Sequence, residues 1–142
     1  MRNVSQILER KGNRIIAVSP DAPVLEAIRL MAEHHIGAVL VIEGGQLLGI
    51  ASERDYARKV VLQGRSSSDT PVNAIMSAPV VCVGPHDSVA DCMAIMTERH
   101  IRHLPVLDGS RLVGVVSIGD LVKELIEEQK QEISYLQQYI SG

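Results

Sequence analysis

The sequence predicts an α/β fold made of two similar half-units. The chain repeats itself, and each copy shows the same order of apolar runs and turns. A unit this short buries little core alone, so two copies are needed to form one. Residues 15–56 align with residues 80–121 without a gap. The two copies are therefore expected to pack on each other with pseudo-twofold symmetry and to leave a cleft lined twice by the same groups. The identical positions in the first copy are Val18, Pro20, Val24, Met31, Glu33, His35, Ile36, Val41, Gly44, Leu47, Gly49, Ser52 and Asp55.

Each copy is expected to run strand, helix, strand, strand, helix. In the first copy, the apolar run 15–18 predicts a buried strand, and Asp21 is expected to cap the following helix. Residues 38–42 and 47–51 predict a hairpin turning at Glu43-Gly44-Gly45, and a second helix is expected from Ser52 to about Gln63. One face of the first helix is apolar and carries Val24, Ala27, Ile28, Met31 and His35.

The second copy predicts the same elements after a polar linker. A strand is expected near residues 80–83, a helix over about 87–99, a hairpin turning at Asp108-Gly109 and a helix from about Ile118. Short helical segments, 4–9 and 72–76, precede the copies. The expected divisions are a first repeat at 1–63, a linker at 64–71, a second repeat at 72–125 and a C-terminal helical extension at 126–142.

Composition limits the class of protein. The net charge is −3, and no long basic run is present, so no nucleic-acid surface is expected. No apolar stretch approaches the roughly 20 residues of a membrane helix. The first ten residues lack the apolar core of a signal peptide, so a cytoplasmic protein is expected. Cys82 and Cys92 lack CxxC spacing and are interpreted as small buried hydrophobes in a reducing compartment.

A Gly-x-x-Ser-x-x-Asp pattern recurs where the third strand of each copy meets a helix. Its glycine leaves room for a flat ring, and its serine and the helix start can donate to a phosphate. Its carboxylate accepts only, which suits ribose hydroxyls. Helix capping is the alternative reading of each serine and aspartate, and the duplication favours binding. The pattern comprises Gly49, Ser52 and Asp55, then Gly114, Ser117 and Asp120.

Four segments together resemble a tandem pair of cystathionine-β-synthase (CBS) domains, over about residues 4–125. They are Ser19-Pro20-Asp21, His100 to Val106, Gly114 to Leu121 and the related Gly49 to Tyr56. The resemblance implies a regulatory module that binds AMP, ADP, ATP, NAD(H) or S-adenosylmethionine and signals to a partner protein. It also implies a homodimer, since tandem CBS pairs commonly associate as flat dimers through their helices.

The resemblance implies two nucleotide sites in the cleft, each built from both repeats. Site one pairs Ser52, Arg54 and Asp55 with Arg102, His103 and Pro105. Site two pairs Ser117 and Asp120 with Ile36, Gly37 and Ala38. Arg54 and Arg102 can bind phosphate at site one, whereas Gly37 and Ala38 replace the basic residues at site two, where Arg14 or another subunit would have to supply a cation. The set also includes Ile15, Pro79 and Gly114.

The C-terminal segment carries an apolar stripe at spacings of four and three, which indicates either a helix packed on its own domain or a helix pair between subunits. The stripe comprises Val122, Ile126, Gln129, Ile133, Leu136 and Ile140. No metal site is expected from His34, His35 and His100, because no ligand cluster accompanies them; His100 is expected at a helix end.

Two other classes of function stay open. A small dinucleotide-dependent oxidoreductase would use the same cleft, although no GxGxxG lies between a strand and a helix and no acid–base or nucleophile pair is evident. A scaffold with empty sites would need no ligand, although Asp55 and Asp120 are both intact.

Overall fold

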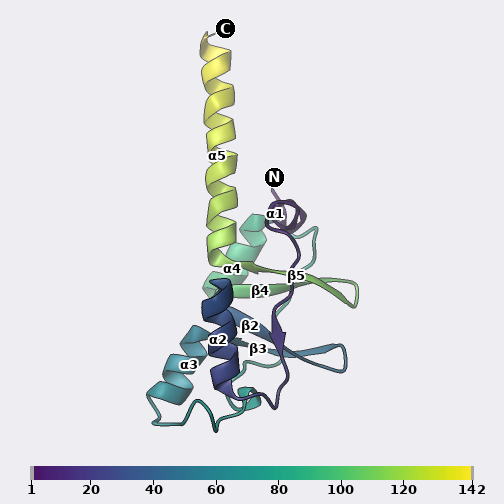
Figure 1. Ribbon diagram of the computed structural model, residues 1–142. Helices are drawn as coiled ribbons and strands as arrows, with labels where there is room; N and C mark the ends of the chain where they lie inside the picture. The colour runs from purple at the N-terminus through teal and green to yellow at the C-terminus, as the bar shows by residue number, and fades with distance from the viewer. Residues whose placement is uncertain (1, 142) are drawn as a thin grey trace. The chain divides into compact units, whose positions relative to one another are not determined.

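The computed structural model describes residues 2–141, which fall into two compact units (Figure 1). The first-repeat unit is residues 15–80. The second-repeat unit joins the N-terminal segment up to Arg14 with the segment from Val81 onward. The helix ahead of the first repeat in sequence therefore packs with the second repeat in space, an assignment that the order of motifs along the chain does not reveal.

The first-repeat unit holds a three-stranded sheet in the order β1-β2-β3. Strand β1 (Ala17–Val18) pairs parallel with β2 (Ala38–Glu43), and β2 pairs antiparallel with β3 (Gln46–Ser52). The hairpin and its glycine turn are confirmed, with Gly44 and Gly45 both at positive φ. The first strand is shorter than predicted, because only two residues of the apolar run reach β2.

The helices of the first-repeat unit start close to the predicted positions, but the residue that caps α2 differs from the prediction. Helix α2 (Val24–His34) has Pro23 at its N-cap and no side-chain cap hydrogen bond, so the prediction that Asp21 caps it is wrong. Helix α3 (Glu53–Tyr56) begins after Ser52 as predicted and continues as the π-helical turn η1 (Ala57–Val61). A 3₁₀ turn, η2 (Val72–Ala74), precedes the second repeat.

The second-repeat unit repeats the hairpin and both helices. Helix α4 (Val89–Arg99) is capped by Ser88, strands β4 (His103–Asp108) and β5 (Arg111–Ser117) pair antiparallel, and α5 (Ile118–Ser141) follows directly. The strand predicted near residues 80–83 is absent: Val83 makes a single parallel bridge to Val106. Helix α1 (Val4–Lys11) completes the unit.

One core pattern fills both units, which explains why the sequence repeats. Val24, Ala27 and Met31 on α2 are buried, and Val89, Cys92 and Met96 are buried at the matching positions of α4. His35 and His100 end these helices in the left-handed conformation, each with φ 55°. The expectation that His100 is a helix-end residue is confirmed. The remaining buried apolar residues are Val18, Val39, Leu40, Val41, Ala51, Val60, Val72 and Ile75 in the first-repeat unit, and Val4, Ile7, Val83, Leu104, Val106, Val116 and Leu121 in the second-repeat unit.

The repeated glycines let a leading segment lie against each hairpin. A Cβ on Gly49 would lie 2.7 Å from Met76 Sδ, and one on Gly114 would lie 2.7 Å from Leu8 Cδ2. Both glycines therefore have a packing reason inside their own unit. The space at their α-carbons, which the sequence pattern assigned to a flat ligand ring, holds a side chain of the protein.

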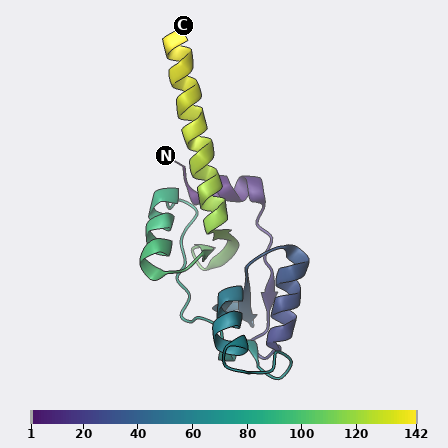
Figure 2. The same ribbon diagram turned by 90° about the vertical axis from the view of Figure 1, so that its left-hand side faces the viewer.

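Helix α5 is continuous over 24 residues, with no break where the second repeat was expected to give way to an extension. Its first turns pack in the second-repeat unit through Leu121 and Leu125. Its C-terminal half projects beyond α1 and α4 in both views (Figures 1 and 2). Between Arg2 and Ser141, no helix combines the length and apolar character needed to cross a bilayer.

Candidate functional site

The Ser52/Asp55 pair forms a reciprocal cap at the junction of β3 and α3. The backbone N–H of Asp55 donates to Ser52 Oγ at 3.1 Å, and the Ser52 N–H donates to Asp55 Oδ2 at 3.0 Å. The Ser52 hydroxyl donates to the same Oδ2. Lys59, one turn later, places its Nζ 3.5 Å from Asp55 Oδ1. Ser52 and Asp55 therefore do cap the start of α3. The Asp55 carboxylate still has lone pairs that can accept from further donors.

The Ser117/Asp120 pair repeats this geometry where β5 meets α5. The Asp120 N–H donates to Ser117 Oγ at 3.2 Å, and the Ser117 N–H donates to Asp120 Oδ2 at 2.8 Å. The same motif therefore sets the same carboxylate at a strand–helix junction in both units. Asp120 is partly buried, with 23% of its side chain exposed, so it is open to a donor from solvent.

Lys11 contributes a cation to the second motif that the sequence pattern did not predict. Its Nζ lies 2.6 Å from Asp120 Oδ2 and donates to the Val115 carbonyl at 2.9 Å. Lys11 ends α1, far from Asp120 in the chain. No motif spacing points to it, because the contact depends on α1 packing in the second-repeat unit.

Each unit brings the start of one strand beside its own Ser/Asp motif. In the first-repeat unit, Ala38 lies opposite Ser52, and the Glu53 N–H donates to the Gly37 carbonyl at 3.0 Å. In the second-repeat unit, His103 lies opposite Ser117, and the Ile118 N–H donates to the Arg102 carbonyl at 2.9 Å. The predicted grouping of motif and strand residues from different repeats stays a prediction.

His103 lies in a charged, partly buried setting that lowers the pKa of its imidazole. Burial is the main cause, because it disfavours the charged form, and the positive charges of Lys11 and Arg102 act in the same direction. Asp120 acts against them. At neutral pH the ring is therefore neutral and offers one donor and one acceptor.

The other predicted residues fall in varied settings. Arg54, Arg102 and Pro79 are exposed, whereas Ile15 is partly buried. Pro105 is buried in β4, and its carbonyl accepts from the Val83 N–H at 3.0 Å. Ile36 and Gly37 line a hollow of about 360 Å³ in the first-repeat unit, together with Ile28, Met31, Ala32, His35 and Glu53.

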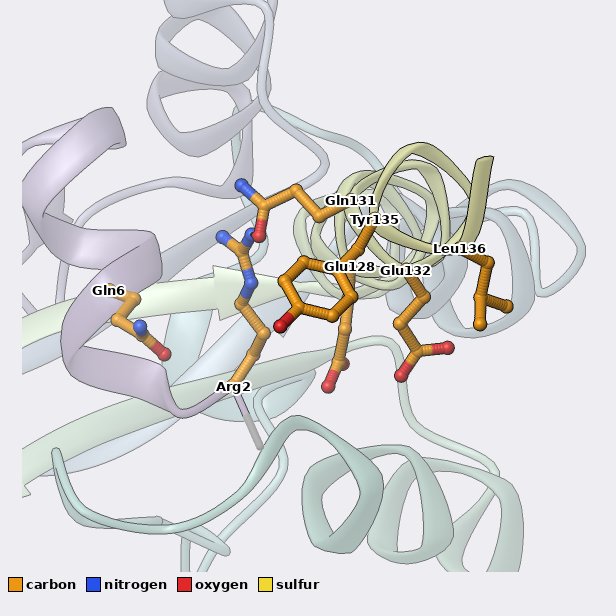
Figure 3. Close-up of a pocket in the computed structure, with 7 residues that line it drawn as sticks. All are labelled: Arg2, Gln6, Glu128, Gln131, Glu132, Tyr135 and Leu136. Atoms are coloured by element: carbon orange, nitrogen blue, oxygen red, sulfur yellow. The ribbon is translucent and has the colours of Figure 1, made fainter. Parts of the chain in front are cut away.

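A second hollow, of about 550 Å³, lies between α1 and α5 in the second-repeat unit (Figure 3). Arg2 points across it to Gln131, and none of the predicted nucleotide-binding residues lines it. Among residues 2–141, no cluster of three or more His, Cys, Asp or Glu side chains could hold a metal ion.

Comparison with known proteins identifies the class. The sequence model of the CBS domain matches the chain twice, at residues 4–62 and 72–127. The chain therefore belongs to the CBS domain family, as a tandem pair, which confirms the fold class and the resemblance.

Two further matches, one curated sequence and one solved structure, cover most of this chain. A mitochondrial CBS domain-containing protein of Arabidopsis thaliana is 36% identical over 148 residues, covering 98% of this chain and 72% of its own length. The structure of a CBS-domain protein from Burkholderia ambifaria is 54% identical, covers 89% of this chain and 96% of its own, and superposes with a TM-score of 0.86.

A third structure, a CBS domain pair solved in complex with 5′-methylthioadenosine and S-adenosyl-L-methionine, is 23% identical and has a TM-score of 0.79. The superposition covers 90% of this chain and 98% of the chain in that structure. At this identity the likeness concerns the fold.

Proposed function

We propose that this protein is a regulatory module that binds an adenine nucleotide (AMP, ADP, ATP or NAD(H)) in a cleft between its CBS repeats and passes occupancy to a partner protein. The observation that carries the proposal is the duplicated carboxylate: Asp55 and Asp120 hold the same position at two strand–helix junctions. Membership of the CBS family and the adenosyl ligands of a relative with this fold support it. No catalytic step is required, since differential binding alone shifts a conformational equilibrium.

The proposed sites combine residues of both repeats. Site one takes Ser52 and Asp55 for the ribose and Arg102 for a phosphate. Site two takes Ser117 and Asp120 with the strand residues 36–38. Lys11 supplies site two with the cation that Gly37 and Ala38 do not provide, so both sites accept phosphorylated ligands. Arg54, exposed at the start of α3, adds a second cation at site one.

The cellular setting belongs to the same proposal. A nucleotide sensor responds to the cytosolic adenylate pool, so we place the protein in the cytoplasm and expect it to act as a homodimer on an effector. An oxidoreductase would bind the same dinucleotides but would also turn over NADH. A scaffold would bind neither.

Calorimetric titration with AMP, ADP, ATP, NAD and S-adenosylmethionine tests the proposal. A ligand should bind and raise the melting temperature by mass action. Asp55→Ala and Asp120→Ala should each weaken one site by about 1.5–3 kcal/mol, the range for a hydrogen bond to a charged group. The double variant should bind almost nothing. Absence of heat and of thermal stabilisation with every ligand would overturn the proposal.

Ser88→Ala is the matched control for these substitutions. Ser88 Oγ caps α4 by accepting from the Asp91 N–H at 3.0 Å, as Ser52 caps α3, but it belongs to no Gly-x-x-Ser-x-x-Asp motif. Its loss should lower stability by about 0.5–2 kcal/mol and leave ligand affinity unchanged. An equal loss of affinity in the control would assign the aspartates to capping alone.

A further inference from the structure

Helix α5 exposes an apolar stripe that its own unit does not cover. The fraction exposed rises along the helix, from 40% for Val122 and 46% for Ile126 to 55% for Ile133, 59% for Leu136 and 82% for Ile140. Leu121 and Glu124, on other faces of the first turns, are buried. In its first turns the helix thus has one side committed to the second-repeat unit, whereas residues 129–141 are all exposed.

The open side has the pattern of a two-stranded coiled coil. Written as heptads, Ile126, Ile133 and Ile140 occupy a, and Val122, Gln129 and Leu136 occupy d. β-Branched residues at a with leucine at d favour two parallel strands, and this chain has isoleucine at all three a positions and leucine at one of the three d positions, Leu136. The exposed part of α5, residues 129–141, has no packing partner in its own unit, and an isolated helical segment of about 12–15 residues is marginal in water. An exposed apolar stripe of this kind marks an interaction site.

The opposite side of α5 is anchored to the unit's own N-terminal segment. Arg2 donates to Glu124 Oε2 at 2.9 Å. It also donates to the side-chain oxygen of Gln131, one heptad further along, and the two side chains lie side by side in Figure 3. Arg10 pairs with the other oxygen of Glu124 at 3.0 Å. Glu124 and Gln131 both occupy heptad position f, opposite the a/d stripe. These contacts hold position f against the N-terminal segment, and of the stripe residues Leu136 borders the hollow beside Arg2.

We infer that the stripe is covered by α5 of a second copy of this chain, with the two helices parallel and in register. The polar residue in the stripe selects this arrangement. In register, Gln129 lies opposite the partner's Gln129, and the two amides can hydrogen-bond to each other. In the antiparallel alignment that overlaps the whole stripe, Gln129 lies opposite the partner's Ile133. Its side-chain amide would then be buried without a hydrogen-bond partner, which costs free energy.

Charge favours the same orientation. Lys123 and Lys130 occupy e, and Glu132 occupies g. The antiparallel alignment brings Lys130 against the partner's Lys130 and Glu132 against the partner's Glu132, because e faces e and g faces g. The parallel alignment pairs e with g, and then Lys130 faces the partner's Leu125 and Glu132 faces the partner's Gln137. No like charges meet in that arrangement.

Two substitutions that each add one negative charge to α5 test the interface. Ile133→Asp lies within the stripe and should raise the self-dissociation constant of the full chain at least about tenfold, the effect of roughly 1.4 kcal/mol. Gln138→Asp lies at position f on the far side and should change it less than about twofold. Equilibrium sedimentation measures both constants. Equal effects, or no effect of either, would overturn the inference.

Ile140→Cys tests the orientation. Parallel helices in register bring the two introduced thiols to the separation of about 4.4–6.8 Å between α-carbons that a disulfide requires. The antiparallel alignment separates them by about 27 Å. Mild oxidation should therefore give an interchain disulfide, which adding Ile133→Asp should abolish. The wild type, with Cys82 and Cys92 but no cysteine on α5, should stay uncross-linked. An Ile140→Cys variant that associates without cross-linking would overturn the parallel arrangement.

These results are independent of the proposed function, because neither the association nor the disulfide requires a nucleotide. A protein that cross-links through α5 and binds no ligand would refute the nucleotide proposal alone. A protein that binds nucleotide as expected, but whose self-dissociation constant is unchanged by Ile133→Asp, would refute the helix pair alone.

Discussion

Lys11 Nζ lies 2.6 Å from Asp120 Oδ2, so the carboxylate of the second motif carries its own cation. The first motif lacks so close a partner, since Lys59 Nζ lies 3.5 Å from Asp55 Oδ1. The two repeats therefore share a backbone geometry and differ in the electrostatics of their aspartates.

Lys11→Gln should lower the affinity of the Asp120 site for AMP more than for adenosine. A cation beside the ribose carboxylate can turn to a phosphate, and charge-assisted hydrogen bonds are the stronger class. Stability should change by only about 0–1 kcal/mol, because the ion pair is partly exposed. Paired titrations of both ligands measure the difference. Tighter binding of both ligands by the variant would show instead that Lys11 competes with the ribose.

Arg102→Ala should weaken AMP binding at the Asp55 site by about tenfold or more and leave adenosine almost unaffected. Arg102 is exposed at the start of β4 and has no salt bridge within the part of the chain that the structure describes. Arg99→Ala, in the last turn of α4, removes an equal charge nearby and serves as the control. Equal losses for the two ligands would show that Arg102 does not contact the phosphate.

Gly114→Ala should destabilise the protein by about 1–3 kcal/mol, because its new Cβ would lie 2.7 Å from Leu8 Cδ2. Leu8→Ala in the same chain should recover part of that loss, as a coupling in a double-mutant cycle. Gly119→Ala is the control, since its Cβ would meet only Ser117 Oγ at 3.7 Å. Urea unfolding gives the free energies, and strict additivity of the Gly114 and Leu8 effects would contradict the packing argument.

The protein should lose stability as the pH falls through the range in which His103 would ionise. Its pKa is lowered in the folded protein, chiefly by burial, so the unfolded chain binds the proton more readily. The stabilisation that comes from keeping the His103 ring neutral is complete above the unfolded pKa of about 6.5. It is lost as the pH falls from that value toward the lower pKa of the folded protein. His103→Gln should flatten the dependence of unfolding free energy on pH between about 7.5 and 5.5. His86→Gln, at an exposed position, should leave it steep.

Much of the fold was predictable from local pattern. Both hairpins and the start of α3 at Ser52 follow from glycine turns, apolar alternation and a serine–aspartate cap, all of which act within a few residues. The errors have equally local causes. Asp21 is a good capping residue, but α2 starts after Pro23. The apolar run near Val83 resembles a strand, but only Val83 bridges to Val106.

The candidate site was predictable in its residue types and less so in its contacts. The duplication pointed to Asp55 and Asp120, and the structure places both in reciprocal caps. The partner of Asp120 was missed, because Lys11 belongs to a helix that lies outside the two aligned copies. The repeated Gly49 and Gly114 were predicted to admit a ligand ring, yet they admit Met76 and Leu8.

The order of residues is enough to establish a duplicated α/β chain with a Ser/Asp pair at each strand–helix junction, because periodicity, turn residues and caps operate over a few neighbouring positions. The packing of α1 in the second-repeat unit, where Lys11 meets Asp120 and Arg2 meets Glu124, becomes visible only in the folded molecule. Those contacts join residues more than a hundred positions apart. Burial of the apolar face of α1, through Val4 and Ile7, fixes them, and that burial depends on the surface offered by β5 and α5.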